Sequence, residues 1–163
     1  MNLTLILICS IITIATFLFW EFVAWFSHKY IMHGFLWSWH KSHHTVHKHT
    51  LEKNDLFGVV FSIPSIVISM YAITYNKPYL FSVSLGIFLY GLFYVVFHDF
   101  IVHQRLKWRP KNRSNYLNRM INAHYVHHSK HSQENCESFG FLIVPSKYEK
   151  QNLKIRKERQ ETQ

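Results

Sequence analysis

Histidines are the residues of this chain whose type and spacing point most directly to chemistry. Ten of the 13 histidines fall into two copies of one pattern, in which two histidines at i and i+5 precede a His-x-x-His-His motif. Neutral imidazole is the commonest protein ligand for borderline transition metals. The doubled pattern therefore predicts a site that holds two metal ions through nitrogen ligands from His28, His33, His40, His43, His44, His98, His103, His124, His127 and His128.

The spacing also bears on how these histidines are presented. On an α-helix, residues i and i+5 lie about 140° apart, so each such pair can face a shared cavity without forming one narrow stripe. Residues i, i+3 and i+4 share a helical face, so each His-x-x-His-His motif can give two or three nitrogens to one metal or bridge toward two. A histidine-rich storage tract is the alternative, but such tracts are irregular in spacing.

Carboxylates are expected to play a subordinate role. The chain has neither the Glu-x-x-His motif of soluble di-iron bundles nor the His-Glu-x-x-His motif of metalloproteases. The site is therefore expected to be dominated by histidine, with carboxylates only as hydrogen-bond partners of the ligands. Candidates for that role, each of which could equally be an ordinary solvated or capping carboxylate, are Glu21, Asp55, Asp99 and Glu134.

Three apolar runs must position these histidines. Residues 3–26, 56–75 and 79–97 are each long and apolar enough to span a bilayer, and the turn at residues 76–78 joins the last two into a hairpin. A cleaved signal peptide is disfavoured for the first run, because no basic region precedes it. At 163 residues, we expect one membrane domain. With two cysteines, the chain has no disulfide framework and no thiolate zinc site.

Basic residues predict the orientation. All but one of the 18 Lys and Arg residues lie between the first two runs or after the third, and only Lys77 lies on the other side. The positive-inside rule then makes residues 28–55 and 98–163 cytoplasmic, with a polar tail at about 147–163. Both histidine sets emerge on that face. The predicted fold is an all-α integral membrane protein of about three transmembrane helices, whose cytoplasmic extensions carry a histidine-rich dimetal site.

The basic segment 104–123 has two interpretations. Such a cluster beside a membrane favours anionic lipid, and it could also dock an acidic electron carrier. Nucleic acid is not expected as a partner so close to a membrane.

Longer stretches around the histidines carry a resemblance. The spacings resemble the membrane fatty-acid hydroxylase and desaturase superfamily of histidine-box di-iron enzymes. Within it, residues from about 20 to 145 are similar to the bacterial β-carotene 3-hydroxylases. The stretches that carry this similarity are His28-Lys-Tyr-Ile-Met-His33-Gly, Trp39-His-Lys-Ser-His-His44, Glu52-Lys-Asn-Asp-Leu56, His98-Asp-Phe-Ile-Val-His-Gln-Arg105 and Cys136-Glu-Ser-Phe-Gly-Phe-Leu142.

The resemblance implies a chemistry and a substrate. It implies two iron ions, O2, and external electrons from ferredoxin or an NAD(P)H-linked chain, which together hydroxylate ring carbon 3 of β-carotene to give β-cryptoxanthin and then zeaxanthin. The ten patterned histidines carry over as iron ligands. His47 and His131 stand where the family has arginine and are expected to be partners or surface residues, as is His49. Phe100 stands where glycine is frequent, so packing beside His98 is expected to differ.

Other functions are kept as alternatives. Phe35, Trp37, Trp39 and residues 139–144 are candidates to line a pocket for the substrate ring, or else interfacial anchors. The enzyme alternatives are a fatty-acid or sterol hydroxylase, a desaturase or a carotene ketolase of the same superfamily. The alternative that is not an enzyme is a membrane metal-binding or transport protein, which predicts ionisable residues deep within the passes. Such residues are nearly absent here. The sequence leaves the oligomeric state open.

Overall fold

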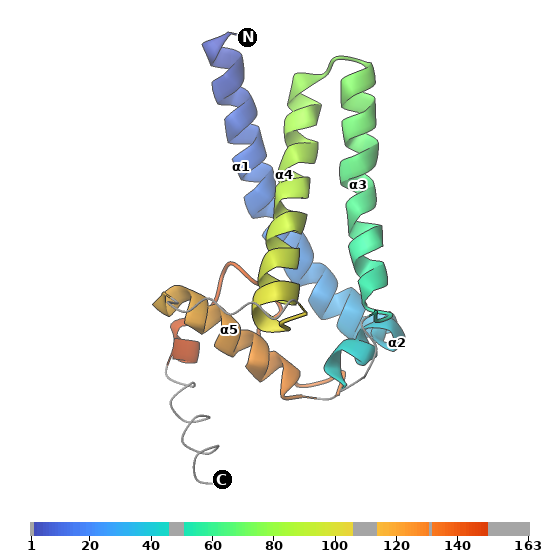
Figure 1. Cartoon of the computed structure of the whole chain (residues 1–163), viewed down its shortest axis with the longest axis vertical. Coiled ribbons are helices and arrows are strands. Elements are labelled where there is room, and N and C mark those ends of the chain that lie inside the picture. Colours follow the sequence, from blue (N-terminus) through green and yellow to red (C-terminus); the bar gives the residue numbers. More distant parts are fainter. Residues whose placement is uncertain (1, 46–50, 106–113, 131, 150–163) are drawn as a thin grey trace.

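The computed structural model describes residues 2–45, 51–105, 114–130 and 132–149. Three long helices stand side by side and carry a smaller helical layer at one end (Figure 1). Within the described ranges every regular element is a helix, which confirms the all-α prediction. The elements are α1 (Leu3–Phe26), η1 (Ser27–Phe35), α2 (Trp37–His40), η2 (Lys41–His44), α3 (Asp55–Thr74), α4 (Pro78–Tyr94), η3 (Val95–Val102), α5 (Asn115–His128) and η4 (Ser146–Glu149).

Three helices are long and apolar enough to cross a membrane, as predicted: Leu3–Phe35, Asp55–Thr74 and Pro78–Val102. Their outward-facing side chains are large and apolar, such as Ile11, Val67 and Phe88, and a bilayer would cover them. The first and third helices continue beyond the predicted ends of the runs. These continuations carry the histidines away from the lipid-facing part of the bundle.

Short contacts hold the three helices together. Gly86 lets α4 approach α1 closely, because a Cβ atom at that position would lie 2.6 Å from the carbonyl oxygen of Thr13. The hydroxyl of Ser65 in α3 donates to the carbonyl oxygen of Ser84 in α4. In the turn of the α3–α4 hairpin, Asn76 adopts a positive φ of 51°. Small and hydroxylated residues are the usual means by which membrane helices pack.

Both helical continuations, η1 and η3, are wound as π-helices. A π-helix joins residue i to residue i+5 by a backbone hydrogen bond, and the amide of His103 donates to the carbonyl oxygen of His98 at 2.9 Å. The two histidines of each i, i+5 pair therefore lie about one turn apart, with ring centroids 5.3 Å apart for His28 and His33 and 4.5 Å apart for His98 and His103. The winding of η1 is interrupted by a kink at Gly34. The α-helical angle of about 140° does not apply to these windings, but the two members of each pair do lie together, as expected for a shared cavity.

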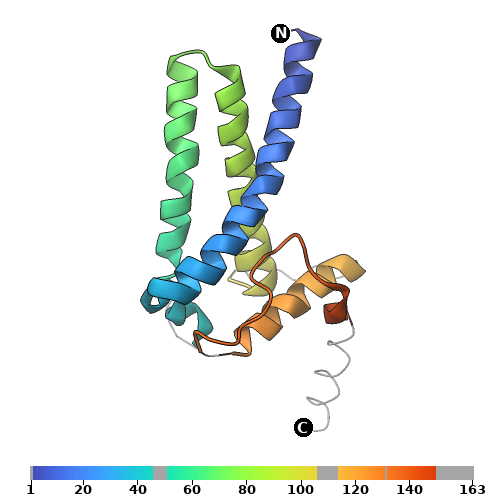
Figure 2. The ribbon, with the colours of Figure 1, turned by 180° about the vertical axis from the view of Figure 1, so that it is seen from behind.

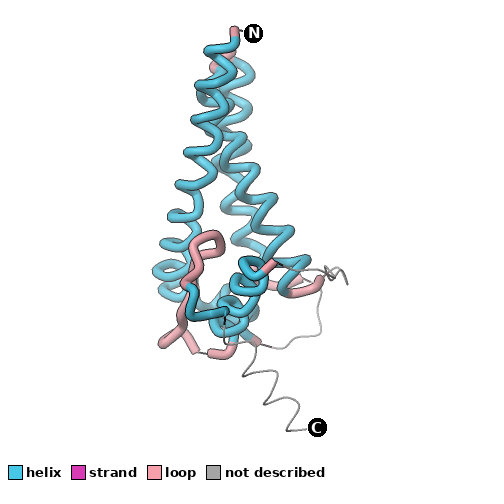
Figure 3. Tube along the Cα trace, turned by 90° about the vertical axis from the view of Figure 1, so that its left-hand side faces the viewer, coloured by secondary structure: helices cyan, strands magenta, loops and turns pink. Residues whose placement is uncertain are grey.

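The layer beyond the spanning helices surrounds the histidines. In Figure 2, α5 crosses under the long helices and the segment that precedes η4 folds up beside α1. Viewed from the side, the loops gather at this end of the molecule (Figure 3). A buried apolar cluster joins η3 to α5, to this final segment and to η4 through Phe97, Val102, Met120, Ile121, Ala123, Phe141, Val144 and Tyr148.

Candidate metal centre

All ten patterned histidines come together in two groups of five, and within each group the available ring nitrogens lie within 4.8 Å of one another. Group 1 consists of His28, His33, His40, His44 and His127. Group 2 consists of His43, His98, His103, His124 and His128. His47, His49 and His131 lie outside the described residues.

Each group contains four histidines from one copy of the sequence pattern and one histidine from the other copy. Each i, i+5 pair joins the first and last histidines of the motif that follows it in the chain. The middle histidine of each motif crosses over, so His43 enters group 2 and His127 enters group 1. Of the two arrangements that the spacing allowed, the structure shows the one in which each motif bridges toward two sites.

Local structure explains the crossing in the first motif. His40 ends the α-helix α2, whereas His43 and His44 lie in the 3-10 helix η2. The tighter winding turns His43 toward His98, and their Nε2 atoms are 2.8 Å apart. The second motif lies at the end of the regular helix α5, which begins at the N-cap residue Ser114, whose hydroxyl accepts from the Leu117 amide.

In group 1, each Nδ1 atom lies within hydrogen-bond distance of a carbonyl oxygen. Four of them lie 2.9–3.1 Å from the backbone carbonyl oxygens of Phe139, Gln133, Lys130 and Glu137. The fifth, from His40, lies 2.7 Å from Oδ1 of Asn54. A carbonyl oxygen can only accept, so Nδ1 must carry the proton and Nε2 of a neutral ring presents a lone pair.

In group 2, carboxylates take the place of carbonyl oxygens. Nδ1 of His43 is 3.2 Å from Glu52 and Nδ1 of His98 is 2.6 Å from Asp99. Arg105 donates to Glu52 at 3.1 Å and to Asp55 at 2.7 Å. A carboxylate partner raises the basicity of a ligating imidazole. The two groups therefore differ electrostatically, and group 2 is the richer in negative charge.

The arrangement of the nitrogens fits bound metal. Nε2 of His33 and Nε2 of His127 are 3.1 Å apart, although both rings donate from Nδ1 to carbonyl oxygens. Two lone pairs at this distance repel unless a cation lies between them. With metal–nitrogen bonds of about 2.1 Å, as found for zinc, donors at right angles lie about 3.0 Å apart. Among the described residues, the buried Nε2 of His128 has no hydrogen-bond partner at all.

The protonation state of the histidines also favours metal binding, because burial keeps them neutral. Burial, together with neighbouring imidazoles, lowers the pKa of His127 from 6.5 to about 2. Burial lowers the pKa of His40 to about 3 and that of His103 to about 4, and it lowers the pKa of His43 and His124 as well. The ligands are therefore neutral near pH 7, the form in which imidazole binds metal.

The carboxylates predicted as partners divide into three cases. Asp99 contacts a histidine of the site, as expected. Asp55 is one step removed, because it holds Arg105 and the amide of Glu52 instead of an imidazole. No hydrogen bond from Glu21 or from the Glu134 side chain to a histidine is found among the described residues. The roles of Glu52 and Asn54 were missed: the resemblance marked their stretch, but no spacing to the histidines indicates a contact with His43 or His40.

Glu21 binds the chain segment around Phe141 instead of a histidine. Its Oε1 accepts the backbone amides of Phe141 at 2.7 Å, Leu142 at 2.8 Å and Ile143 at 3.3 Å, and its Oε2 accepts the Tyr90 hydroxyl at 2.7 Å. A Cβ at Gly140 would lie 2.6 Å from Oε1, so a side chain there would displace the carboxylate from this position. Glu21 thereby anchors the segment that supplies carbonyl oxygens to group 1.

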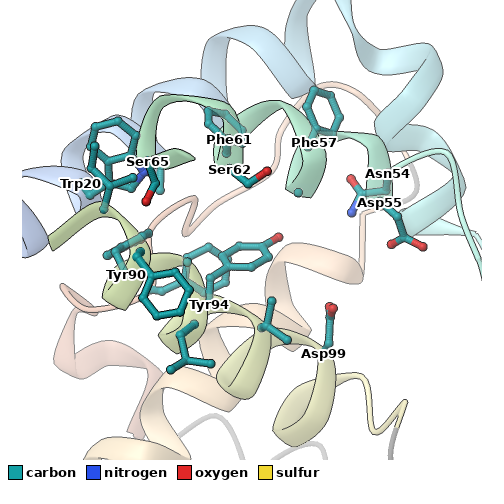
Figure 4. Close-up of a pocket in the computed structure, with 18 of the residues that line it drawn as sticks. Trp20, Asn54, Asp55, Phe57, Phe61, Ser62, Ser65, Tyr90, Tyr94 and Asp99 are labelled. Carbon is teal, nitrogen blue, oxygen red and sulfur yellow. The ribbon is translucent and has the colours of Figure 1, made fainter. Parts of the chain in front are cut away.

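A cavity of about 670 Å³ lies between α1, α3 and α4 and reaches the metal centre. Figure 4 shows Phe57, Phe61 and Ser65 of α3 on one side of it, Tyr90 and Tyr94 of α4 on another, and Asn54, Asp55 and Asp99 at one end. His28 and Phe141 also line it. The expected pocket residues Phe35, Trp37 and Trp39 do not: Phe35 is exposed, Trp37 packs on His33 and His44, and Trp39 packs on Phe57.

Comparison with known proteins agrees with this site. The fatty acid hydroxylase family matches residues 13–144. The beta-carotene hydroxylase of Paracoccus sp. (strain PC1) is 44% identical over 136 residues, which cover 83% of each chain. That of Pantoea ananas is 43% identical over 83% of this chain and 77% of its own. No solved structure matches significantly. The chain belongs to the fatty acid hydroxylase family of oxidoreductases, within its group of bacterial beta-carotene hydroxylases.

Proposed function

We propose that the protein is a β-carotene 3-hydroxylase, which converts β-carotene to β-cryptoxanthin and then to zeaxanthin. One observation carries the proposal beyond the names of the relatives. Ten imidazoles converge in two groups at the inner end of an apolar cavity that lies among three membrane helices. This arrangement supports a site for oxidative chemistry that a lipid-dissolved hydrocarbon can reach.

The metal proposed is iron. Nitrogen-rich sites suit zinc, iron, copper or nickel, but a hydroxylase needs a redox-active metal, and zinc is not one. When bound, two irons would supply the oxidant for an unactivated C–H bond, so that one atom of O2 enters the product and the other leaves as water, with two electrons and two protons from outside.

The side chains of the protein hold and orient this centre. Group 1 would hold one iron through five imidazoles whose orientation comes from backbone carbonyl oxygens and Asn54. Group 2 would hold the other, with Glu52 and Asp99 behind two of its imidazoles. The ring of Phe139 packs on group 1, 5.2 Å from His127, and that of Phe141 packs on group 2, 5.7 Å from His124, and these rings keep water from the histidines.

The remaining expectations concern location and electron supply. The distribution of Lys and Arg supports a cytoplasmic metal centre. The basic segment 104–123, of which residues 106–113 lie outside the described residues, is the proposed docking surface for a ferredoxin-type donor. Reversing Arg109 and Arg113 to Glu should slow turnover with ferredoxin and spare metal content. Unchanged ferredoxin-dependent turnover would exclude this docking surface.

The direct test is expression in a host that accumulates β-carotene, followed by pigment analysis. The expected products are 3-hydroxylated carotenoids, and His43→Ala and His127→Ala should abolish them, since each removes a ligand. Unchanged carotene with altered lipids would indicate a fatty-acid or sterol enzyme of the same superfamily. Products with a 4-keto group would indicate a ketolase. Either result would overturn the proposal.

A transport function is less well supported. Transport requires ionisable groups along a path through the membrane. Glu21 is the one acidic residue inside α1, and both of its oxygens are engaged by the Tyr90 hydroxyl and backbone amides. The described helices therefore provide no chain of free ionisable groups across the bilayer.

A further inference from the structure

The cavity between α1, α3 and α4 is long and runs along the membrane helices. Its lining extends over residues 55–66 of α3, about 16 Å at the rise of an α-helix, and over a similar length of α4 and η3. The dimensions suit one end of a rod-shaped molecule better than a compact one.

The inner end of the cavity touches the surroundings of both metal groups. His28 of group 1 lines it directly. Asn54, which bonds His40 of group 1, and Asp99, which bonds His98 of group 2, line it as well. A molecule that fills the cavity would therefore present its end to the dimetal centre from the membrane side.

The part of the cavity inside the bundle offers few free polar groups. The hydroxyl of Ser62 donates to the Val59 carbonyl oxygen, that of Ser65 to Ser84, and that of Tyr90 to Glu21. Hydroxyls that are already bonded within the protein have no need of a polar ligand. Apart from the hydroxyl of Tyr94 and the indole of Trp20, the rest of this wall is aromatic and aliphatic, which favours a hydrocarbon.

Several residues of α3 and α4 that line the cavity are exposed: Gly58, Ser62, Ile66, Phe88, Gly91, Leu92 and Val95. Their exposure points to an opening of the cavity between these two helices. Two of them are glycines, and a Cβ atom at Gly58 or Gly91 would meet nothing within 4 Å. The wall of the cavity is therefore least filled at Gly58 and Gly91, where neither helix carries a side chain.

We propose that this cavity binds the substrate and that the substrate enters it sideways from the lipid, ring first, through the opening at Gly58 and Gly91. The identity of the occupant, a carotenoid with one unoxygenated ring at the metal centre and its polyene running out into the bilayer, rests on the proposed function. A side chain at either glycine would fill the path without disturbing the packing of the helices.

The test is a graded series of Ala, Val and Leu at Gly58 and, separately, at Gly91, with Val67→Leu as the control. Val67 lies on the lipid-facing side of α3 and does not line the cavity. Each purified protein is assayed for metal content, for binding of β-carotene in detergent micelles without an electron donor, and for hydroxylation. The Leu variants should keep their metal but bind β-carotene at least about tenfold more weakly, with smaller losses for Val and Ala.

The outcomes separate the two proposals. If the wild-type protein yields 3-hydroxylated carotenoids and the Leu variants bind and react as it does, the cavity is not the substrate site. If a Leu variant loses metal, the Val variant at that position is compared, and normal binding by a metal-replete Val variant likewise refutes the inference. If the wild-type protein neither binds nor hydroxylates β-carotene, the proposed function fails, and the carotenoid occupant fails with it.

Discussion

Replacing Glu21 is predicted to weaken metal binding by group 1, although Glu21 forms no hydrogen bond with the histidines of that group among the described residues. Glu21→Leu leaves the buried amides of Phe141 and Leu142, and the hydroxyl of Tyr90, without their acceptor. An unsatisfied buried donor costs about 1–3 kcal/mol, so the two amides alone disfavour docking of the segment by roughly 2–6 kcal/mol, or about 30-fold and more.

The consequence should be selective. The anchored segment supplies the carbonyl oxygens of Glu137 and Phe139 that orient His127 and His28, whereas group 2 relies on Glu52 and Asp99. Glu21→Leu should therefore lower the metal content from about two ions to about one per chain.

The assay is elemental analysis of the purified protein together with the Mössbauer spectrum after loading with isotopically enriched iron. Glu21→Gln serves as the matched control, because its amide keeps an oxygen for the backbone amides, and it should hold close to the wild-type metal content. A Glu21→Leu protein with two metals per chain and an unchanged spectrum would show that the segment does not position group 1.

Three further predictions concern the metal centre. His43→Ala should weaken the metal of group 2, and His127→Ala that of group 1, in the Mössbauer spectrum; the reverse assignment would disprove the crossed arrangement. Glu52→Gln keeps an acceptor but removes charge, so it should shift the spectrum of group 2 and leave that of group 1 unchanged; equal shifts in both would contradict the inequality of the two groups. In the metal-free protein, burial lowers the pKa of His40 to about 3 and of His103 to about 4, so unfolding takes up protons below the ordinary value of 6.5. The free energy of unfolding should have its highest value above pH 6.5 and should fall as the pH drops toward 4. Denaturation followed by circular dichroism checks this, and a stability that rises on acidification would refute it.

The spanning helices and the grouping of the ten histidines were accessible from sequence because each rests on a local rule. A bilayer demands about 20 apolar residues, and the chain has three such runs. The ten histidines repeat one spacing, and all ten come together in the structure. The winding of the i, i+5 pairs was not accessible, because a π-helix is rare and depends on tertiary contacts.

The parts that sequence reasoning missed depend on residues far apart in the chain. Glu21 was expected to be a hydrogen-bond partner of the ligands, but its partners are the Tyr90 hydroxyl and the backbone amides of a segment that begins 120 residues away in the chain. Glu52 is closer in the chain, but its contact with Nδ1 of His43 spans nine residues and follows from no helical spacing. Gly58 and Gly91 line the cavity without a side chain. Reasoning from residue types instead predicted large aromatic residues such as Trp37 as the lining of the pocket.

The stretches that carried the family resemblance now have physical roles. Glu52 and Asp55 meet Arg105 in one ion-pair network behind group 2. Gly140 is the position at which the 138–142 stretch passes against Glu21. The motifs therefore describe the supports of the metal centre as well as its ligands.

The measurement that tests the account most directly is a metal count on the purified protein combined with pigment analysis of the same preparation. The account predicts two irons per chain and O2-dependent formation of 3-hydroxylated carotenoid that is lost when the iron is removed. A protein that binds one metal or none, or that forms the product without iron, would contradict it.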